Sequence, residues 1–286
     1  MKLTRVAPYL FVLLWSTGFV GAKYGLPYAD PFIFLSLRVL IAALILFAVA
    51  SLKRAPVAIG LSNIAKSSII GFFLHACYLG GVFFAISTGL SAGVAAVVTS
   101  LQPVLVSLLG VKILGERLKN RQLIGLIFGL TGVILVLSPG FSSPLPIAGV
   151  VAITIALLGT TCATLLQKKL GAQIPILSGT AYQYCASGLI LLVAAITTGS
   201  TSITWSGHFI VAFIWLILVL SVGAVLLLLW LLNNGSAAGV SSLFYLVPPA
   251  TALEAYLLFG ESVSIIGVFG IGITAFGVWL VIKTKN

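Results

Sequence analysis

The chain has 286 residues, of which 60% are hydrophobic and only 7% are charged. Soluble globular domains carry roughly 25% charged residues, so this composition excludes a soluble enzyme and a nucleic-acid binder, in spite of the net charge of +11. Intrinsic disorder is excluded as well, because disordered chains are poor in apolar residues. The remaining class is an all-α integral membrane protein, whose partner is the lipid bilayer and not a nucleic acid.

Stretches without charge predict ten transmembrane helices, since about 20 apolar residues cross a bilayer. Two short stretches predict one helix each, three long ones break at turn-forming residues into two, two and three helices, and the last predicts the tenth. In chain order the stretches are 6–22, 31–52 (where only Arg38 is charged), 67–111, 122–167, 170–253 (whose last helix runs on through Glu254 to about Phe259) and 262–282. The first stretch also fits a secretory signal peptide, but the repeat described below needs it as a helix.

The basic residues predict the orientation, because cytoplasmic loops are enriched in Lys and Arg. With the N-terminus in the cytoplasm, thirteen of the fifteen bases fall on the inner side, Lys23 falls outside and Arg38 lies within a span. We therefore expect a multi-pass protein of the inner membrane with both termini in the cytoplasm. The thirteen bases are Lys2, Arg5, Lys53, Arg54, Lys66, Lys112, Arg117, Lys119, Arg121, Lys168, Lys169, Lys283 and Lys285.

The sequence contains a repeat at an offset of 145 or 146 residues. Ser91-Ala92-Gly93-Val94 resembles Ala237-Ala238-Gly239-Val240, and Leu114-Gly115-Glu116 resembles Phe259-Gly260-Glu261. We therefore divide the chain into 1–140 and 141–286, with five spans each. Because five is odd, the second half must enter the membrane inverted, which is an architecture of alternating-access transporters. A duplicated scaffold without transport is the alternative.

Several short motifs, in their order along the chain, resemble a known family. They are Leu14-Trp15-Ser16-Thr17-Gly18-Phe19-Val20-Gly21-Ala22-Lys23, Asp30-Pro31 followed by Arg38, the proline of the fourth helix, and the paired motifs that end in Glu116 and Glu261. The first run resembles the start of an EamA domain, and the whole chain resembles the ten-helix members of the drug/metabolite transporter superfamily. The second half departs from the pattern, with Leu158-Gly159-Thr160 in place of Leu14-Trp15-Ser16 and Tyr182 in place of Arg38.

The resemblance implies that helices one to four and six to nine surround a central path, with five and ten at the periphery. It also implies transport of small metabolites, often amino acids or toxic cations, and often outward. Helices five and ten are rich in glycine, and small residues permit close helix contact. The glycines suit either a homodimer face or a contact within the protomer. They are Gly125, Gly129, Gly132, Gly267, Gly270, Gly272 and Gly277.

Ionisable groups inside spans mark candidate sites, because they are costly in hydrocarbon and by default face the interior. Arg38 suits a substrate carboxylate or a structural role, bonded to helix-end carbonyls or to Glu254. Glu254 suits a proton carrier or a cation site, or a partner for Arg38 or Lys23. We expect Arg38 and Glu254 to compensate each other, directly or through water. His75 suits hydrogen bonding to substrate or a proton relay, or a neutral histidine satisfied by a carbonyl.

Prolines and aromatic residues complete the candidate pathway. Gln102-Pro103 and Pro248-Pro249 fall near the centres of helices four and nine, where proline frees a backbone carbonyl. They predict paired substrate-facing kinks, with a packing kink as the alternative. Aromatic side chains within the spans suit a cage for flat or cationic cargo, or plain packing. They are Trp15, Tyr78, Tyr182, Tyr184 and Tyr245. The candidate pathway is therefore Trp15, Arg38, His75, Tyr78, Gln102, Pro103, Tyr182, Tyr245, Pro248 and Glu254.

The leading prediction is a secondary transporter that exports a small amphipathic metabolite, such as an amino acid, by alternating access. The motif GxxxxGK[ST] is absent, so the energy would come from an ion gradient such as H+ or from the gradient of the substrate itself. A membrane channel and a membrane-embedded enzyme are the alternatives. The enzyme lacks a catalytic constellation, because the two histidines lie 133 residues apart. The three cysteines form no CxxC pair, so we expect no metal and no cofactor. Glu116 and Glu261 are expected to favour the N-termini of helices five and ten.

Overall fold

The described residues of the protein are mainly helical. The computed structural model describes residues 2–90, 95, 98–137, 146–259 and 264–283. Within these ranges there is no β-strand, and Ala29 and Ile203 form an isolated antiparallel bridge. The all-α prediction is confirmed for this part of the chain.

The first part of the chain forms helices that run back and forth along one axis. They are α1 (Lys2–Gly25), the 3-10 turn η1 (Leu26–Tyr28), α2 (Pro31–Leu52), α3 (Leu61–Gly71), the π-helix η2 (Phe72–Leu79), α4 (Gly80–Ser87), α6 (Gln102–Leu114) and α7 (Asn120–Leu137). Because α3, η2 and α4 follow one another without a gap, they form one long rod.

The second part of the chain is also helical. Its elements are α8 (Ile147–Leu170), α9 (Ile176–Thr198), α10 (Gly207–Trp215), the π-helix η4 (Leu216–Ala224), α11 (Val225–Asn234), α12 (Ala237–Ser241), the 3-10 helix η5 (Ser242–Leu246), α13 (Val247–Phe259) and α14 (Ile265–Lys283). A π-helix again lies inside a long rod, at η4 as at η2. Such segments are rare and are frequent at functional sites.

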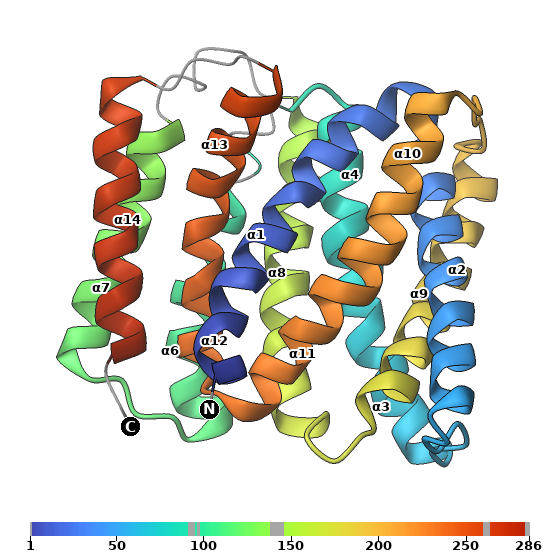
Figure 1. The fold of residues 1–286 in the computed structure, drawn as a ribbon, viewed down its shortest axis with the longest axis horizontal. Helices are drawn as coiled ribbons and strands as arrows, with labels where there is room; N and C mark the ends of the chain where they lie inside the picture. Colours follow the sequence, from blue (N-terminus) through green and yellow to red (C-terminus); the bar gives the residue numbers. More distant parts are fainter. Residues whose placement is uncertain (1, 91–94, 96–97, 138–145, 260–263, 284–286) are drawn as a thin grey trace.

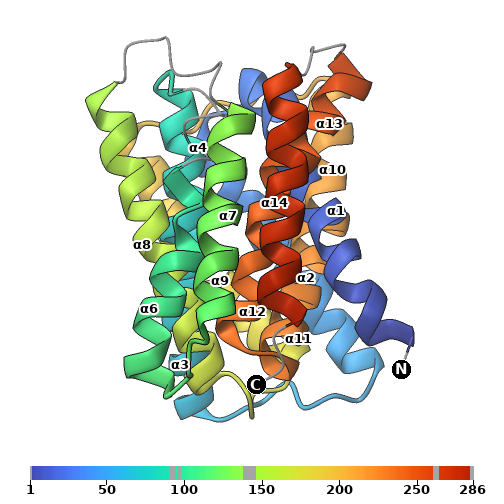
Figure 2. The same cartoon turned by 90° about the vertical axis from the view of Figure 1, so that its left-hand side faces the viewer.

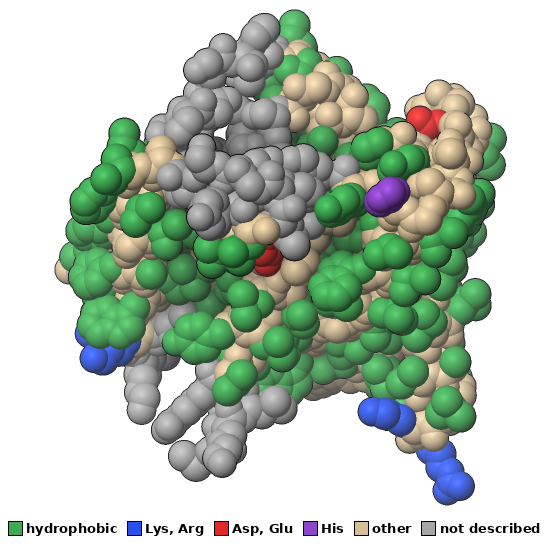
Figure 3. Space-filling view, turned by 45° about the horizontal axis from the view of Figure 1, so that its top comes forward, with side chains coloured by type: hydrophobic (Ala, Val, Ile, Leu, Met, Phe, Trp, Pro, Cys, Tyr) green, Lys and Arg blue, Asp and Glu red, His purple; other side chains and the backbone are tan. Residues whose placement is uncertain are grey.

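The helices stand side by side as a bundle, and α1 begins at the end of the bundle where α14 ends (Figures 1 and 2). Several helix ends that carry bases lie at this same end of the bundle: the ends of α2, α6, α8 and α14 and the start of α7. Hydrophobic side chains cover most of the visible sides, whereas blue atoms appear toward this end (Figure 3).

Five helical stretches are long and apolar enough to cross a membrane: Pro31–Leu52, Leu61–Ser87, Ile147–Leu170, Ile176–Thr198 and Gly207–Asn234. Four shorter apolar helices lie at Val6–Gly18, Gln102–Leu114, Asn120–Leu135 and Ile265–Val281. These lengths fit a multi-pass membrane protein. The count of ten spans and the inverted relation of the halves go further and stay predictions.

Helices α7 and α14 pack against each other through their glycines. A methyl group on Gly125 would lie 2.7 Å from the carbonyl oxygen of Gly277, and one on Gly132 would lie 2.6 Å from the carbonyl oxygen of Gly270. Only glycine permits such close approach of the two backbones. A contact within the protomer therefore explains these glycines, and a homodimer across the outward faces of α7 and α14 stays a prediction.

Candidate functional site

Trp15 of α1 and Tyr78 of η2 form a stacked aromatic pair in the middle of the bundle. Their ring centroids lie 6.5 Å apart at an interplanar angle of 11°, and each side chain is only 5% exposed. Both side chains line each of two neighbouring cavities. We call these the Gln102 cavity and the Arg38 cavity, and the aromatic pair is the wall that they share.

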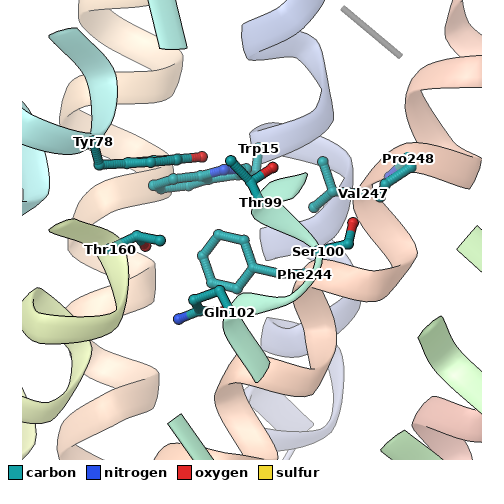
Figure 4. A pocket seen from close by; sticks show the side chains of 9 residues that line it. All are labelled: Trp15, Tyr78, Thr99, Ser100, Gln102, Thr160, Phe244, Val247 and Pro248. Atoms are coloured by element: carbon teal, nitrogen blue, oxygen red, sulfur yellow. The ribbon is translucent and has the colours of Figure 1, made fainter. Parts of the chain in front are cut away.

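The Gln102 cavity combines aromatic side chains with uncharged polar groups. It is lined by Trp15, Tyr78, Thr99, Ser100, Gln102, Thr160, Phe244, Val247 and Pro248. In Figure 4 the rings of Tyr78 and Trp15 lie above that of Phe244, and Gln102 lies below it. The Gln102 amide donates to Thr164 Oγ1 at 3.0 Å, while its Oε1 is buried without a donor. The cavity can therefore contact flat apolar groups and hydrogen-bond donors.

Helix starts place Gln102 and Pro248 at this cavity. Helix α6 begins at Gln102, with Pro103 next, and α13 begins at Val247, with Pro248 next. Proline is tolerated in the first turn of a helix, because its missing N–H would have no partner there. At the predicted kinks a turn precedes α6, and the 3-10 helix η5 passes directly into α13. Pro103 is buried beside Gln102 but does not line the cavity.

The Arg38 cavity is mainly apolar and holds one cation. It is lined by Trp15, Gly18, Ala22, Arg38, Tyr78, Leu79, Val82, Phe83, Ile86, Leu220 and Val225. Arg38 is 1% exposed. Its Nε donates to Ser221 Oγ of η4 at 2.8 Å, and its Nη1 is buried without an acceptor. The Tyr184 hydroxyl in turn donates to the backbone carbonyl of Ser221.

Glu254 lies elsewhere, so the predicted direct pairing of Arg38 with Glu254 is wrong. The Oε1 of Glu254 accepts a hydrogen bond from Ser16 Oγ of α1 at 2.5 Å. Glu254 lines a separate, wide cleft together with Thr17, Gly21, Tyr24, Gly207, His208, Val211, Ala212 and Trp215. Helix α1 separates the two groups, because its residues 18 and 22 face the Arg38 cavity and residues 17 and 21 face this cleft.

Three other predicted residues lie outside both cavities. His75 is buried, its ring lies 4.5 Å from that of Tyr184, and neither ring nitrogen has a hydrogen-bond partner. Tyr182 packs edge-on against Phe47, with centroids 5.1 Å apart. Tyr245 is fully buried, and its hydroxyl has no hydrogen-bond partner. The five-residue aromatic cage is therefore not formed, and only Trp15 and Tyr78 of that set line the cavities.

Sequence reasoning missed five of the nine residues that line the Gln102 cavity: Thr99, Ser100, Thr160, Phe244 and Val247. Phe244 packs edge-on against Trp15, with centroids 5.4 Å apart, and nothing distinguishes it among the 17 phenylalanines of the chain. Thr160 lines the cavity from α8. The repeat carried a signal for Thr160, because Leu158-Gly159-Thr160 takes the place of Leu14-Trp15-Ser16.

Glu116 makes a contact between the two parts of the chain. Its carboxylate accepts hydrogen bonds from the backbone N–H groups of Ala237 at 2.8 Å and Ala238 at 3.4 Å, at the start of α12. The expectation that Glu116 favours the start of the fifth helix is therefore corrected: its carboxylate caps α12. Glu261, its counterpart in the repeat, lies outside the described residues.

The site offers few metal ligands. Among the described residues there is no cluster of three or more His, Cys, Asp or Glu side chains. The chemistry of the two cavities is therefore that of one guanidinium, hydroxyl and amide groups, and aromatic rings.

Comparisons with known proteins agree with this geometry. The uncharacterized transporter YvbV of Bacillus subtilis (strain 168) is 26% identical over 99% of this chain and 93% of its own length. The uncharacterized inner membrane transporter YedA of Escherichia coli (strain K12) is 26% identical over 98% of this chain and 90% of its own length. Protein PecM of Dickeya dadantii (strain 3937) is 30% identical over 69% of this chain and 64% of its own length.

The fold is also shared with a solved crystal structure, at a TM-score of 0.82 and 20% identity over 96% of this chain and 94% of the other. The EamA-like transporter family matches the chain twice, over residues 7–138 and 147–283. The two matches together cover nearly the whole chain. The chain therefore belongs to the EamA-like transporter family, a family of membrane transporters.

Proposed function

We propose that the chain is a secondary transporter that exports a small amphipathic metabolite across the inner membrane by alternating access. The observation that carries the proposal is the Trp15–Tyr78 pair between two cavities. Each cavity is lined from both segments that match the family. In alternating-access transporters the substrate site lies between the repeats, near the membrane midplane.

The lining of the cavities favours an amphipathic cargo. Trp15, Tyr78 and Phe244 contact a flat or apolar body, while Gln102 Oε1 accepts from a cargo N–H or O–H group. Amino acids and related compounds have both parts. To pass from one cavity to the other, the cargo must separate the two stacked rings, so the pair acts as the gate in this proposal.

Topology is part of the proposal. Ten spans in two inverted halves are supported by the double family match, by the π-helices η2 and η4, and by the matching helix starts at Gln102 and Val247. Cytoplasmic termini are supported by the basic helix ends that lie at the end of the bundle where α1 begins.

A proton is the coupling ion that the structure favours. Glu254 is a half-buried carboxyl group that accepts from Ser16, next to Trp15 in the sequence. Loss of its charge would alter this bond beside the gate. We expect Glu254→Gln to abolish stimulation of transport by a pH gradient while counterflow at equal pH persists. Loss of counterflow with unchanged folding would contradict this role.

Counterflow in proteoliposomes tests the proposal. A thermal-shift screen of amino acids, nucleosides and quaternary amines first selects the compound with the largest shift. We expect saturable uptake of that compound with trans-stimulation, which Trp15→Ala weakens and Trp205→Ala leaves unchanged, because Trp205 is 60% exposed. Uptake that neither saturates nor responds to internal substrate would indicate a channel and contradict the proposal.

A further inference from the structure

We infer that Arg38 binds the carboxylate of the cargo, so that the transported compound is a small organic acid with an apolar or aromatic body. The inference rests on the proposed function, because it assigns the class of compound that passes the Trp15–Tyr78 pair. The family resemblance left two kinds of cargo open, amino acids and toxic cations. An Arg38 that binds carboxylates favours the first kind.

The first observation is that the Arg38 charge is buried without a counter-ion among the described acids. Arg38 is 1% exposed and lines a cavity. Asp30 accepts from the backbone of Ser202, Glu116 from the start of α12, and Glu254 from Ser16. A buried cation without an anionic partner is costly, and a bound anion removes that cost.

The second observation is that the guanidinium is held in place with hydrogen-bonding capacity to spare. Its Nε is fixed by the Ser221 hydroxyl, and Tyr184 fixes the carbonyl of the same serine. Nη1 has no acceptor. A guanidinium has five N–H donors in a planar fork that matches the geometry of a carboxylate. Arg38 is thus oriented before an anion arrives.

The third observation is the asymmetry of the cavity around this cation. The other lining side chains are apolar or aromatic, among them Val82, Phe83 and Leu220. These walls suit the hydrocarbon body of a compound whose acid group contacts Arg38. A quaternary amine placed here would face a like charge without a carboxylate in the cavity lining. Its binding is therefore disfavoured.

The test uses probes that share a body and differ in the charge of the head. We would measure thermal shifts and counterflow with 3-phenylpropanoate, 3-phenylpropanamide and 3-phenylpropylamine, and with hexanoate as a second acid. Hydrogen bonds to charged groups correspond to roughly a tenfold effect on affinity or more. We expect the wild-type chain to bind at least one acid about tenfold more tightly than the amide or amine.

Variants of Arg38 distinguish a carboxylate-binding anchor from a purely structural residue. Arg38→Gln should raise the Kd of the acid about tenfold and leave that of the amide unchanged, whereas Arg38→Lys, which keeps the charge but loses the fork, should fall between them. The matched control is Arg54→Gln, because Arg54 is exposed at the end of α2. If Arg38→Gln does not fold, the order of probe affinities in the wild type and the affinity of the acid for Arg38→Lys test the inference instead.

The outcomes also separate this inference from the proposed function. No stabilisation by either acid, tighter binding of the amine, or an Arg38→Gln variant that binds the acid normally would each overturn the anchor. If the amide or amine shows counterflow that is unchanged by Arg38→Gln, Arg38 is not the carboxylate-binding group, but the chain is a transporter. Tight, Arg38-dependent binding of the acid without counterflow would support the anchor and contradict transport.

Discussion

The two halves of the molecule share a helical plan but contribute different chemistry to the cavities. The first half supplies Trp15, Arg38, Tyr78 and Gln102, while the second supplies Thr160, Leu220 and the aromatic side chain of Phe244. Both halves match the same family. Both halves therefore line the cavities, while the guanidinium in the lining comes from the first half.

Packing explains why the second half did not keep the large side chains. At the place of Trp15 stands Gly159, where a methyl group would lie 2.7 Å from Cys77 Cβ and 2.9 Å from the carbonyl oxygen of Phe73. At the place of Arg38 stands Tyr182, which packs against Phe47. The equivalent positions therefore serve contact between helices α8 and α9 and their neighbours.

Of the changes considered, a large side chain at Gly159 should destabilise the protein most. Gly159→Leu forces α8 away from η2, because the obstacle includes backbone, and overpacking of this kind costs about 3 kcal/mol. We expect a strong fall in the thermal midpoint or in the yield of monodisperse protein. Gly207→Leu is the control, since nothing lies within 4 Å of a methyl group there. Equal behaviour of the two variants would contradict the packing account.

Gln102 joins the halves through a buried amide, so its removal should have the next largest effect. Gln102→Leu loses the bonds to Thr164 and Ser241 and should cost about 1–2 kcal/mol. Thermal unfolding in detergent measures the loss, and counterflow of the selected compound should fall as well. The double variant with Thr164→Val should be less damaging than the sum, because both partners of one bond are then removed. Strict additivity would argue against the bond.

Glu116 joins the halves at the end of the bundle, where the expected effect is smaller. Glu116→Ala removes a carboxylate cap from the start of α12 and should cost about 1 kcal/mol. Glu116→Gln keeps a carbonyl acceptor and should cost less. Thermal midpoints compare these variants with Lys53→Ala, at an exposed position. An unchanged midpoint for Glu116→Ala would show that the cap contributes nothing.

Tyr182 gives the smallest expected effect and sharpens the difference from Arg38. Tyr182→Phe keeps the ring against Phe47, so stability should change by less than about 0.5 kcal/mol. Counterflow with this variant should match the wild type. A loss of transport comparable to that of Arg38→Gln would mean that Tyr182 contributes to recognition of the cargo. It would contradict the functional difference between Arg38 and Tyr182.

Composition and order of motifs predicted the fold class and the family, because both depend on features that are local in the sequence. Four of the candidate residues, Trp15, Tyr78, Gln102 and Pro248, line one cavity, and Arg38 lines the next. These residues could be selected from the sequence because prolines, aromatic residues and polar or charged residues stand out within apolar spans.

The sequence could not predict which side of each helix faces the interior of the bundle. A span that is apolar all round has no polar side to indicate its inner face, so the direct pairing of Arg38 with Glu254 across α1 was wrong. Phe244 was missed because nothing in the sequence distinguishes it among the 17 phenylalanines of the chain. Glu116 was assigned by its local position, whereas its partner lies 121 residues away.

The central claim is that the Trp15–Tyr78 pair separates two cavities on one transport path, and thiol labelling tests it most directly. In a chain with Cys77, Cys162 and Cys185 replaced by alanine, Thr160→Cys reports the Gln102 cavity and Val82→Cys reports the Arg38 cavity. An impermeant thiol reagent should label the first from the cytoplasmic side and the second from the outer side during turnover, and Trp15→Ala should let each be labelled from both sides. Labelling of both cysteines from the same side with Trp15 intact would contradict the account.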